Sequence, residues 1–359
     1  MVDSIQKAIE AFKRGEMLVV TDDDDREGEG DLVVAASLCT PDKMAFIVRH
    51  TSGIVCAPLT AAEARRLRLD PMVSTNDSAH TTAFTVSIDY RHGTTTGISA
   101  DDRTTTVRAL ANPNAGANDF ARPGHIFPLI AKDGGVLMRS GHTEAAVDLC
   151  KLAGLPEIGV ICELVNDDGT VTKGKQVADF AARHKLLHIT TADLIAYRQA
   201  REKLVERVAS FTCDSPIGKL QGYAYKTPFD PVYHMAFVFG SIGDGKATPT
   251  RFHRVDIVAD ILGGAKSVHA ALAKFKEEGR GVLIYLRDGA AGVPLAPPVG
   301  QTESSDDART AQWREVGVGA QILRDLGVSS INHLSHSQRS YVGLSGFGIE
   351  IIEETPFES

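Results

Sequence analysis

The sequence predicts a protein of mixed α+β and α/β fold, built from two consecutive domains. Its 359 residues are about twice a length prior of roughly 150 residues for one domain. Short apolar runs of strand length alternate with segments in which apolar residues recur at helical spacing, and the connections are short. A charged helical segment at 190–207 ends where a new series of strand-like segments starts. We therefore expect α/β domains over residues 1–207 and 208–359.

The elements of the first half follow in order from their periodicity. Ser4 can cap a helix that extends to residue 14, and the run MLVVTDDDD at 17–25 predicts a short buried strand that ends in a polar loop. Further strands are predicted at 53–59, 83–89, 134–139 and 159–165. Further helices are predicted at 41–50, 61–68, 101–111, 143–153, 174–184 and 190–207.

The second half has fewer clear signals. Apolar runs at 234–240 and 279–288 predict strands, and periodic segments at 264–278 and 312–326 predict helices. The stretch 288–309 is rich in Pro, Gly and Ser, which indicates an irregular loop.

The composition limits the classes of function. The chain is 43% hydrophobic with a net charge of −8, which is ordinary for a globular protein and lacks the basic balance typical of nucleic-acid binding. Its five dispersed cysteines, free of CxxC spacing, predict reduced thiols rather than disulfides or a thiolate zinc site. The N-terminus has no apolar signal core, and no run approaches ~18 apolar residues. We expect a cytoplasmic protein that binds neither nucleic acid nor membrane.

Residues 21–32, TDDDDREGEGDL, combine seven carboxylates with one arginine. Like charges at this density repel one another unless water or a cation screens them. A calcium EF-hand loop starting at Asp23 is excluded, because its twelfth position is Val34 instead of a bidentate glutamate. Two interpretations stay open: a solvated acidic loop, or a hard divalent ion held by one or two carboxylates with substrate completing its coordination.

The segment GGVLMRSGHTEAAVDL at 134–149 is typical of a phosphate site. A strand is predicted to end at Met138, and a helix to begin at Thr143, whose hydroxyl can cap it. The helix N-terminus would offer unpaired N–H groups beside Arg139, whose guanidinium suits phosphate oxygens. His142 in the same turn can ligate a metal, or it can be a capping residue with no further role.

Two further residues stand at positions suited to proton transfer. His125 lies in RPGHIFPL, where Pro and Gly predict a constrained turn ahead of an apolar run, and Glu163 ends an otherwise apolar strand. A carboxylate at such a strand end is paired, near a metal, or raised in pKa and available for proton transfer. The alternatives are a hydrogen-bonded turn residue for His125 and a surface acid for Glu163.

Six segments in order over residues 4–200 resemble the 3,4-dihydroxy-2-butanone 4-phosphate synthase family of riboflavin biosynthesis. They are DDDDREGEGDL, HTSGIVCAPLT, TTTGISADDRTTTVRAL, RPGHIFPL, RSGHTEAAVDL and ICELVNDDGT. Together, at the family's spacing, they are far more specific than any one of them. The resemblance implies a homodimeric lyase, dependent on Mg²⁺ or Mn²⁺, that converts ribulose 5-phosphate into 3,4-dihydroxy-2-butanone 4-phosphate and formate.

The resemblance also implies roles for individual residues. The metal ligands would be Glu27 and His142. The catalytic positions would be His125 and Glu163, which transfer protons, and Cys56. The substrate would be bound by Arg26, Glu27, Asp31, Arg139, Ser140, Gly141, His142, Thr143 and Glu163, with Arg139 and Thr143 on the phosphate.

The acidic loop departs from the family at one position. The family has Arg-Glu-Asn-Glu-Gly-Asp there, and Gly28 replaces the asparagine. Because glycine removes a side-chain amide and loosens the backbone, we expect a mobile loop that orders when substrate binds. The expected metal ligation does not depend on this position. The outer acids, Asp22 to Asp25, are expected to be mostly solvated.

Residues 209–357 resemble GTP cyclohydrolase II, best in EGRGVLIYLR, GVGAQILRDLGV and GLSGFGIEIIEETP. That family's three zinc-binding cysteines correspond to Asp256, Ser267 and His269, so we expect no zinc. Other functional positions of that family are also replaced. Its phosphate-contacting turn corresponds to 288–292, an acid to Gln312, a tyrosine to Val316 and a late Asn-Asn-Pro-x-Lys segment to 336–340. Only its arginine is kept among these positions, as Arg314. We expect an inactive domain; the alternatives are a second activity on GTP, or a module that binds nucleotides or flavins or forms a dimer.

Overall fold

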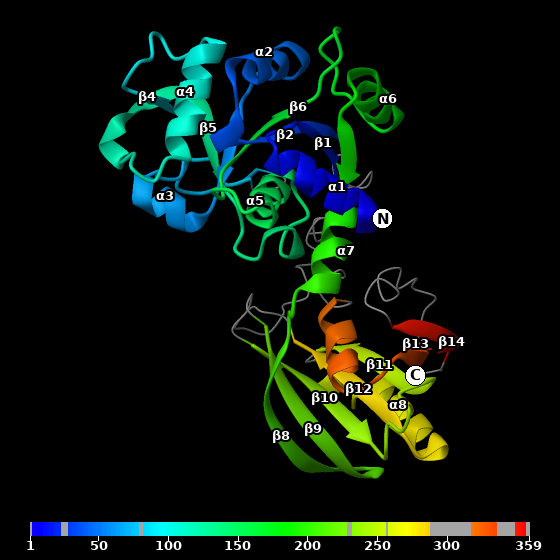
Figure 1. Cartoon of the computed structure of the whole chain (residues 1–359). Coiled ribbons are helices and arrows are strands. Elements are labelled where there is room, and N and C mark those ends of the chain that lie inside the picture. Colours follow the sequence, from blue (N-terminus) through cyan, green and yellow to red (C-terminus); the bar gives the residue numbers. More distant parts are fainter. Residues whose placement is uncertain are drawn as a thin grey trace. The chain divides into compact units, whose positions relative to one another are not determined.

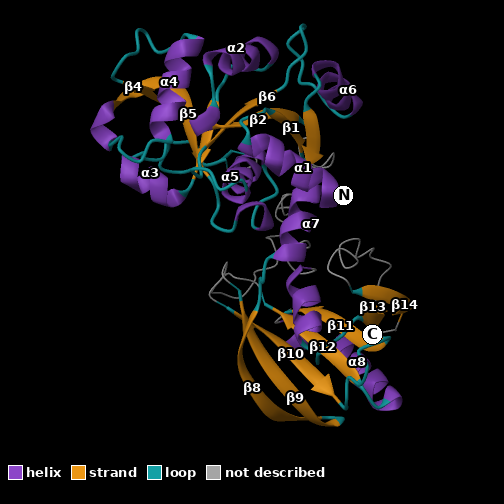
Figure 2. Cartoon of the chain, in the orientation of Figure 1, coloured by secondary structure: helices purple, strands orange, loops and turns teal. Residues whose placement is uncertain are grey.

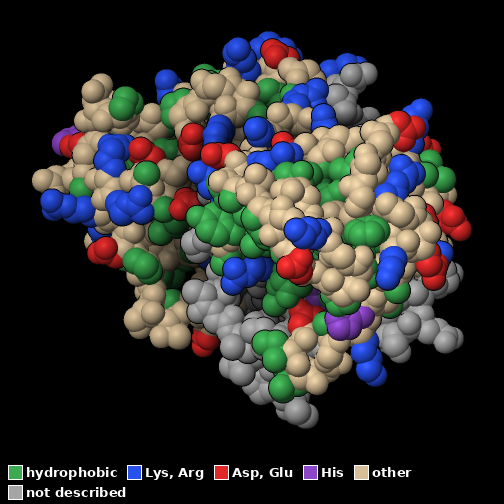
Figure 3. Space-filling model, turned by 90° about the horizontal axis from the view of Figure 1, so that it is seen from below, with side chains coloured by type: hydrophobic (Ala, Val, Ile, Leu, Met, Phe, Trp, Pro, Cys, Tyr) green, Lys and Arg blue, Asp and Glu red, His purple; other side chains and the backbone are tan. Residues whose placement is uncertain are grey.

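The computed structural model describes residues 2–22, 28–78, 82–227, 232–255, 258–287, 317–335 and 349–356. The chain forms two compact units, which divide between Tyr197 and Arg198 within helix α7 (Thr191–Arg201). Each unit combines helices with one seven-stranded sheet, which confirms the predicted mixed α/β fold class (Figure 2). On the face drawn in Figure 3, basic and acidic side chains are interspersed.

The first unit places its helices on both faces of a mixed sheet (Figure 1). The strand order is β4-β5-β3-β6-β2-β1-β7. The strands are β1 (Leu18–Thr21), β2 (Gly30–Ala35), β3 (Cys56–Leu59), β4 (Ile88–Tyr90), β5 (Phe120–Ile130), β6 (Gly159–Glu163) and β7 (Leu187–Thr190). The helices before α7 are α1 (Val2–Lys13), α2 (Pro41–His50), α3 (Ala61–Leu67), α4 (Ala100–Leu110), α5 (His142–Leu152) and α6 (Lys175–His184), with short 3₁₀ turns η1 (Ala36–Leu38), η2 (Ala117–Asp119) and η3 (Gly135–Leu137).

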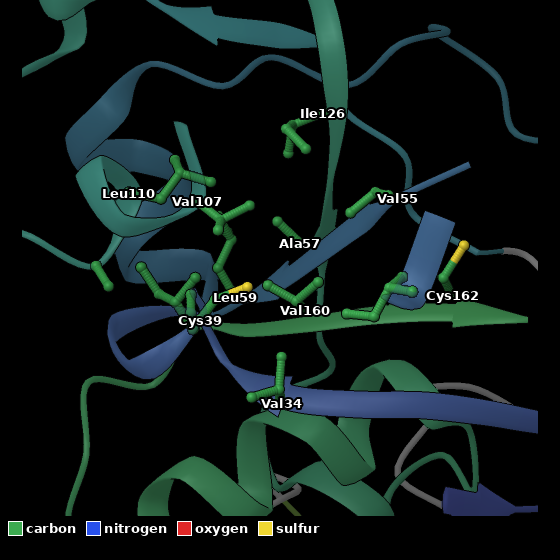
Figure 4. Close-up of a cluster of buried hydrophobic side chains, with 14 of the residues drawn as sticks. Val34, Cys39, Val55, Ala57, Leu59, Val107, Leu110, Ile126, Val160 and Cys162 are labelled. Atoms are coloured by element: carbon green, nitrogen blue, oxygen red, sulfur yellow. The ribbon is translucent and has the colours of Figure 1, made fainter. Parts of the chain in front are cut away.

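One face of this sheet carries the hydrophobic core with α2 and α4. Figure 4 shows side chains of β2, β3, β5 and β6 pointing toward those of α4. Val34, Leu59 and Val160 have no exposed surface. Strands buried on both faces need continuous apolar sequence, which explains why these runs did not alternate with polar residues.

Helix α5 covers the opposite face and packs against β1, β2, β3 and β6. The packing is close, because a Cβ placed on Gly159 of β6 would lie 2.9 Å from the Cβ of Ala146 in α5. A glycine is therefore needed where the helix crosses the strand. This contact brings the N-terminal turn of α5 to one end of the sheet.

Several predicted elements match the structure closely. The helix predicted at 41–50 is α2, which begins after Thr40; the Thr40 hydroxyl accepts a hydrogen bond from the Lys43 amide. Helices predicted at 61–68, 101–111, 143–153 and 174–184 appear as α3, α4, α5 and α6 within one residue of each boundary. Helix α1 begins before Ser4, so Ser4 is not its N-cap.

Three predicted elements were wrong. Residues 134–139 form no strand, since Gly134 and Gly135 both have positive φ and lead into η3. His125 lies in the eleven-residue strand β5 rather than in a turn, because β5 pairs with both β3 and β4. The helix predicted to reach 207 ends at Arg201, and Glu206 already begins a strand, so strand pairing overrides the charged helical pattern there.

The second unit is a mixed sheet with strand order β14-β13-β11-β12-β10-β9-β8. Its strands are β8 (Glu206–Ser215), β9 (Gly218–Lys226), β10 (Tyr233–Phe239), β11 (Thr248–Arg254), β12 (Gly281–Leu286), β13 (Ser330–Ser335) and β14 (Glu350–Pro356). Helix α8 (Lys266–Glu278) packs on one face through Leu272 and Phe275, and the helical residues 317–325 pack on the other. A single π-helical turn, η4 (Val258–Leu262), precedes α8. The stretch 288–309, predicted as a loop, lies outside the described residues.

Candidate active site

Strand register brings four of the expected site residues to one end of the first sheet. Asp31 at the start of β2 pairs with Glu163 at the end of the antiparallel β6. Cys56 at the start of β3 pairs with Ile161, two residues before Glu163. Cys56 also pairs with Phe127 of β5, two residues after His125. Because adjacent strands lie about 4.8 Å apart, these side chains lie close together on four neighbouring strands, at the ends of β2, β3 and β6 and within β5.

These side chains face helix α5. Residues paired in register share a face of the sheet, as do residues two apart, so Asp31, Glu163 and Cys56 point the same way. The first residue of α5, His142, lies over this face, and its Nδ1 is 3.7 Å from Oδ1 of Asp31. Both side chains are buried, at 6% and 2% exposure. The site therefore has an imidazole and a carboxylate in a desolvated position.

The loop before α5 presents Arg139 at the helix N-terminus. Its Nη1 donates to Oε2 of Glu144 at 2.8 Å, and its Nη2 donates to the Thr82 hydroxyl at 3.1 Å. Gly141 is the N-cap, and a Cβ there would meet the Arg139 guanidinium and the Glu144 carboxylate. Ser140 is buried beside them. The expected N-capping role of Thr143 was wrong, since Thr143 lies inside the first turn and Gly141 precedes the helix.

Two buried carboxylates of α5 hold this loop, and sequence reasoning missed both. Glu144 accepts the Lys132 amide at 3.0 Å, and one turn later Asp148 accepts the Val136 amide at 2.9 Å. They are 1% and 4% exposed. The available signal was a pair of acids four residues apart on an otherwise apolar helix, because buried acids need specific donors. The side chain of Arg139 is thus positioned by a loop fastened to α5.

His125 forms a dyad with Asp89, which sequence reasoning also missed. Its Nδ1 lies 2.7 Å from Oδ2 of Asp89, and its backbone amide donates to Oδ1 at 2.8 Å. The His125 side chain is 40% exposed, whereas that of Asp89 is 14% exposed. Gly97 is required nearby, since a Cβ there would meet both side chains. An acid ending the predicted strand at 83–89 was the available signal.

Glu163 and Cys56 differ in their exposure and in the charge that their side chains carry. Glu163 is half-buried and accepts a hydrogen bond from the Ser52 hydroxyl at 2.8 Å. Cys56 is 2% exposed, and its pKa is raised well above 9.0, first by burial and then by the charges of Glu163, Cys162 and Asp31. A thiol in this environment stays protonated at neutral pH. Cys56 therefore lines the site as a neutral thiol, and its catalytic role stays a prediction.

The acidic segment lies next to Asp31 in the sequence. Residues 23–27, which include Arg26 and Glu27, are outside the described residues. The expectation that Asp22 is solvated was wrong: Asp22 is 5% exposed, and its Oδ1 accepts the Glu29 amide at 3.0 Å. Asp22 thus fastens the start of this connection to its end, where Gly28 is also buried.

In the second unit, few of the cyclohydrolase-related positions are described. Ser267 and His269 lie in the first turn of α8, and His269 is exposed. The remaining positions, Asp256, 288–292, Gln312, Arg314, Val316 and 336–340, are outside the described residues. Among the residues that are described, in either unit, no three His, Cys, Asp or Glu side chains are grouped as a metal site.

No helix in the described part of the chain has the length and apolar character needed to cross a membrane. Family models of known proteins match both units. Residues 6–197 match 3,4-dihydroxy-2-butanone 4-phosphate synthase, and residues 206–356 match GTP cyclohydrolase II.

Relatives span the whole chain. The riboflavin biosynthesis protein RibBA of Bacillus cereus is 42% identical over 100% of this chain and 94% of its own length. The bifunctional riboflavin biosynthesis protein RIBA 1 of Arabidopsis thaliana is 43% identical over 99% of this chain and 69% of its own length.

Solved structures agree with the fold. RibBX of A. baumannii, a two-domain 3,4-dihydroxy-2-butanone 4-phosphate synthase, superimposes with a TM-score of 0.83 at 36% identity, covering 98% of this chain and 99% of that one. A synthase in complex with two magnesium ions gives a TM-score of 0.54 at 45% identity, covering 55% of this chain and 97% of that one. The family match, the full-length relatives and the site geometry agree: the chain belongs to the 3,4-dihydroxy-2-butanone 4-phosphate synthase family and carries a second unit of the GTP cyclohydrolase II family.

Proposed function

We propose that the protein is a lyase of riboflavin biosynthesis that converts D-ribulose 5-phosphate into 3,4-dihydroxy-2-butanone 4-phosphate and formate. The carrying observation is the convergence, at one sheet end, of Asp31, Glu163 and Cys56 with the N-terminus of α5. The relatives named for this pathway and this synthase support the same reaction. An anionic sugar with vicinal hydroxyls matches a site that combines carboxylates, imidazoles and a helix N-terminus.

The residues present fit a divalent cation. Buried carboxylate and imidazole side chains meet at His142 and Asp31, next in sequence to an acidic segment, and such donors suit Mg²⁺ or Mn²⁺. We assign His142 and Glu27 as the protein ligands, and the magnesium complex of a related synthase supports this choice of ion. When bound, the ion would stabilise negative charge on the sugar oxygens and orient them.

The substrate phosphate would lie at the N-terminus of α5. The first-turn N–H groups, which include that of Thr143, and the hydroxyl of Ser140 supply donors there, and the absence of a Cβ at Gly141 leaves room for the Arg139 guanidinium. Arg139 would add a charge-assisted contact. Its present partner, Glu144, keeps the guanidinium in place before substrate arrives.

Proton transfers would fall to His125 and Glu163. The C3 proton must leave to give an enediol, a hydroxyl must depart, and C4 is released as formate after the carbon skeleton rearranges. Asp89 fixes the ring of His125 through Nδ1 and leaves Nε2 to exchange the proton. Glu163, held by Ser52, is a second acid–base group on the opposite side of Cys56. Arg26 and Asp31 would bind the sugar hydroxyls.

A direct assay tests this function. Purified full-length protein with ribulose 5-phosphate and Mg²⁺ should release formate, and EDTA should stop the release, with excess Mg²⁺ restoring it. His142→Ala and Glu27→Ala should abolish turnover. Absence of EDTA-sensitive formate release would refute the function, while wild-type activity in both variants would refute the metal assignment.

We assign residues 1–207 as the synthase domain and 208–359 as a cyclohydrolase-like domain without catalysis. The loss of all three zinc-binding cysteines, which correspond to Asp256, Ser267 and His269, supports the inactive assignment. The bifunctional name of a plant relative favours one alternative, a second activity on GTP. Stoichiometric zinc together with GTP turnover would establish that alternative.

We propose that the protein is a cytoplasmic homodimer. Its ligand is ribulose 5-phosphate, and it binds neither nucleic acid nor membrane. The net charge of −8 argues against nucleic-acid binding, and on the face drawn in Figure 3 basic and acidic side chains are mixed. Light scattering at micromolar concentration tests the dimer, and a monomeric mass would refute it.

A further inference from the structure

The second unit contains an apolar pocket that the synthase chemistry does not use. Its volume is about 430 Å³, within the roughly 300–1,000 Å³ range of small-molecule sites. Helix α8 contributes Val268 and Leu272, while the sheet contributes Leu220, Phe237 and Leu283 from β9, β10 and β12. The pocket is therefore formed where the helix crosses the sheet.

Strand register explains why the pocket is apolar. Phe237 pairs with Leu283, and the next residues on that face, Met235 and Tyr285, also pair. These side chains share the face that carries α8, but α8 packs mainly on β11 and β12. Phe237 is consequently only half-buried, whereas Val238 on the opposite face is 7% exposed. Apolar surface beside the helix thus stays accessible.

One wall of the pocket is rigid and carries the polar groups. The Tyr285 hydroxyl donates to Oδ2 of Asp260 at 2.9 Å, and the Tyr285 ring stacks on His253 with centroids 5.2 Å apart. His253 in turn lies 2.9 Å from Oδ1 of Asp260 and is 6% exposed. A ring held from two sides offers a preformed flat surface at little entropic cost.

Arg287 gives the pocket a positive rim. Its side chain lines the pocket and is exposed, and none of the carboxylates in the described ranges forms an ion pair with it. A guanidinium at the edge of an apolar cavity favours a ligand with an anionic group, because the charges attract while the cavity buries the rest.

We propose that this pocket binds a small molecule with an apolar ring system and one anionic group, the rings lying against Tyr285 and the anion meeting Arg287. The site is separate from the synthase residues, and its occupancy does not depend on turnover of ribulose 5-phosphate. It gives the cyclohydrolase-like unit a binding role that needs neither zinc nor an acid–base group.

Two fluorescent probes test the site in the full-length protein. 8-Anilinonaphthalene-1-sulfonate carries an anion, and N-phenyl-1-naphthylamine has similar rings without one. Val268→Phe, which fills the pocket, should weaken both probes by roughly tenfold or more. Arg287→Gln should weaken only the sulfonate, by roughly three- to tenfold.

Matched variants outside the pocket serve as controls. Val208→Phe on β8 makes the same change at a 40% exposed position, and Arg324→Gln removes an exposed arginine of the helical segment 317–325. Both should bind the probes as wild type does. Equal binding by Val268→Phe and wild type would overturn the proposal. A second outcome would also overturn it: the protein is a dimer that does not bind the probes, and Val268→Phe makes it a monomer. The apolar face beside α8 would then be an interface with a second copy of the chain.

Discussion

Gly28 occupies a left-handed backbone conformation, with φ of +63°, and is buried. Glycine adopts this region without steric cost, and asparagine is the residue that tolerates it next best. The replacement of the family's asparagine therefore preserves the backbone at this position. The expected ordering of the loop on substrate binding stays a prediction.

Two substitutions test whether the left-handed backbone at Gly28 is what matters for stability. Gly28→Asn should change the free energy of unfolding by only a few tenths of a kcal/mol, whereas Gly28→Ala should cost about 1 kcal/mol, because a Cβ strains positive φ. Denaturant unfolding of both variants checks the difference. Equal stabilities for asparagine and alanine would show that the backbone there is not left-handed.

In the proposed mechanism, Asp89 acts on catalysis by positioning His125. Asp89→Asn keeps the shape but replaces an accepting oxygen with a donating amide, so the ring loses its orientation. We expect kcat to fall roughly 100-fold with little change in KM or in melting temperature. The control is Asp119→Asn, which alters a similar aspartate–histidine pair, since Asp119 lies 3.0 Å from His92 and neither is a candidate site residue. A matching loss in the control would mean that the effect is structural.

At the scale of elements, the loop before α5 is the part on which the proposed phosphate binding depends. It is fastened by Glu144 and Asp148, and Gly135, with φ of +65°, lies against the Asp148 carboxylate. Because the loop carries Arg139, a change in its path alters the site without touching a substrate contact. Positioning by a helix rather than by the loop itself gives the site its rigidity.

Gly135→Ala tests this dependence. The added Cβ strains the backbone and meets Asp148, so we expect a loss of about 1–3 kcal/mol in unfolding free energy and a several-fold higher KM for ribulose 5-phosphate. Gly154→Ala is the matched control, since Gly154 has φ of +70° but nothing within 4 Å of its Cβ. Gly154→Ala should cost only the strain, about 1 kcal/mol, and leave KM unchanged. An unchanged KM in Gly135→Ala, or an equal rise in both variants, would contradict the proposed dependence of phosphate binding on this loop.

Capping and hydrophobic periodicity were sufficient for most helices, and long-range pairing was decisive for the strands. Thr40 and Pro41 fix the start of α2 locally, so the sequence predicted it without reference to the fold. The apolar run at 134–139 has the composition of a strand. It forms η3 instead, because its glycines have positive φ and because the buried Asp148 carboxylate accepts a hydrogen bond from the Val136 amide. Such demands come from residues on another element and cannot be read from the run itself.

At the scale of the whole molecule, stability should depend on pH through a buried histidine of the second unit. His333 of β13 has no exposed surface, and burial, together with the nearby Arg251 charge, lowers its pKa to about 4. The folded state therefore resists protonation that the unfolded chain accepts near its ordinary value of 6.5. The stabilising contribution is full above pH 6.5 and is lost as pH falls toward 4.

The size of this pH dependence follows from the lowering of the His333 pKa from 6.5 to about 4. We expect about 3 kcal/mol of unfolding free energy to disappear between pH 6.5 and 4 on account of His333. Denaturant titrations across this range measure it, and His333→Gln should flatten the pH dependence even if it lowers stability overall. His269→Gln, at an exposed position of α8, should leave the slope unchanged. An unaltered slope in His333→Gln would refute the assignment.

The sequence by itself determined the two-part α/β organisation, most helices, and the residue types of the site, because periodicity, caps and motif spacing are local properties. It identified Asp31, His125, His142 and Glu163 separately. Only the tertiary structure decided that Asp31, His125 and Glu163 lie on neighbouring strands beside the helix that begins at His142, since pairing between β2, β6, β3 and β5 joins residues 71 to 132 positions apart.

The residues that support the site also could not be predicted from the sequence. Asp89, Glu144 and Asp148 are buried or half-buried acids whose partners are set by the packing of other elements. The same holds for the pocket beside Val268, which exists because α8 leaves part of its sheet uncovered. Local chemistry fixes which elements form, whereas the cost of burying a charge or leaving apolar surface exposed is decided only when those elements meet.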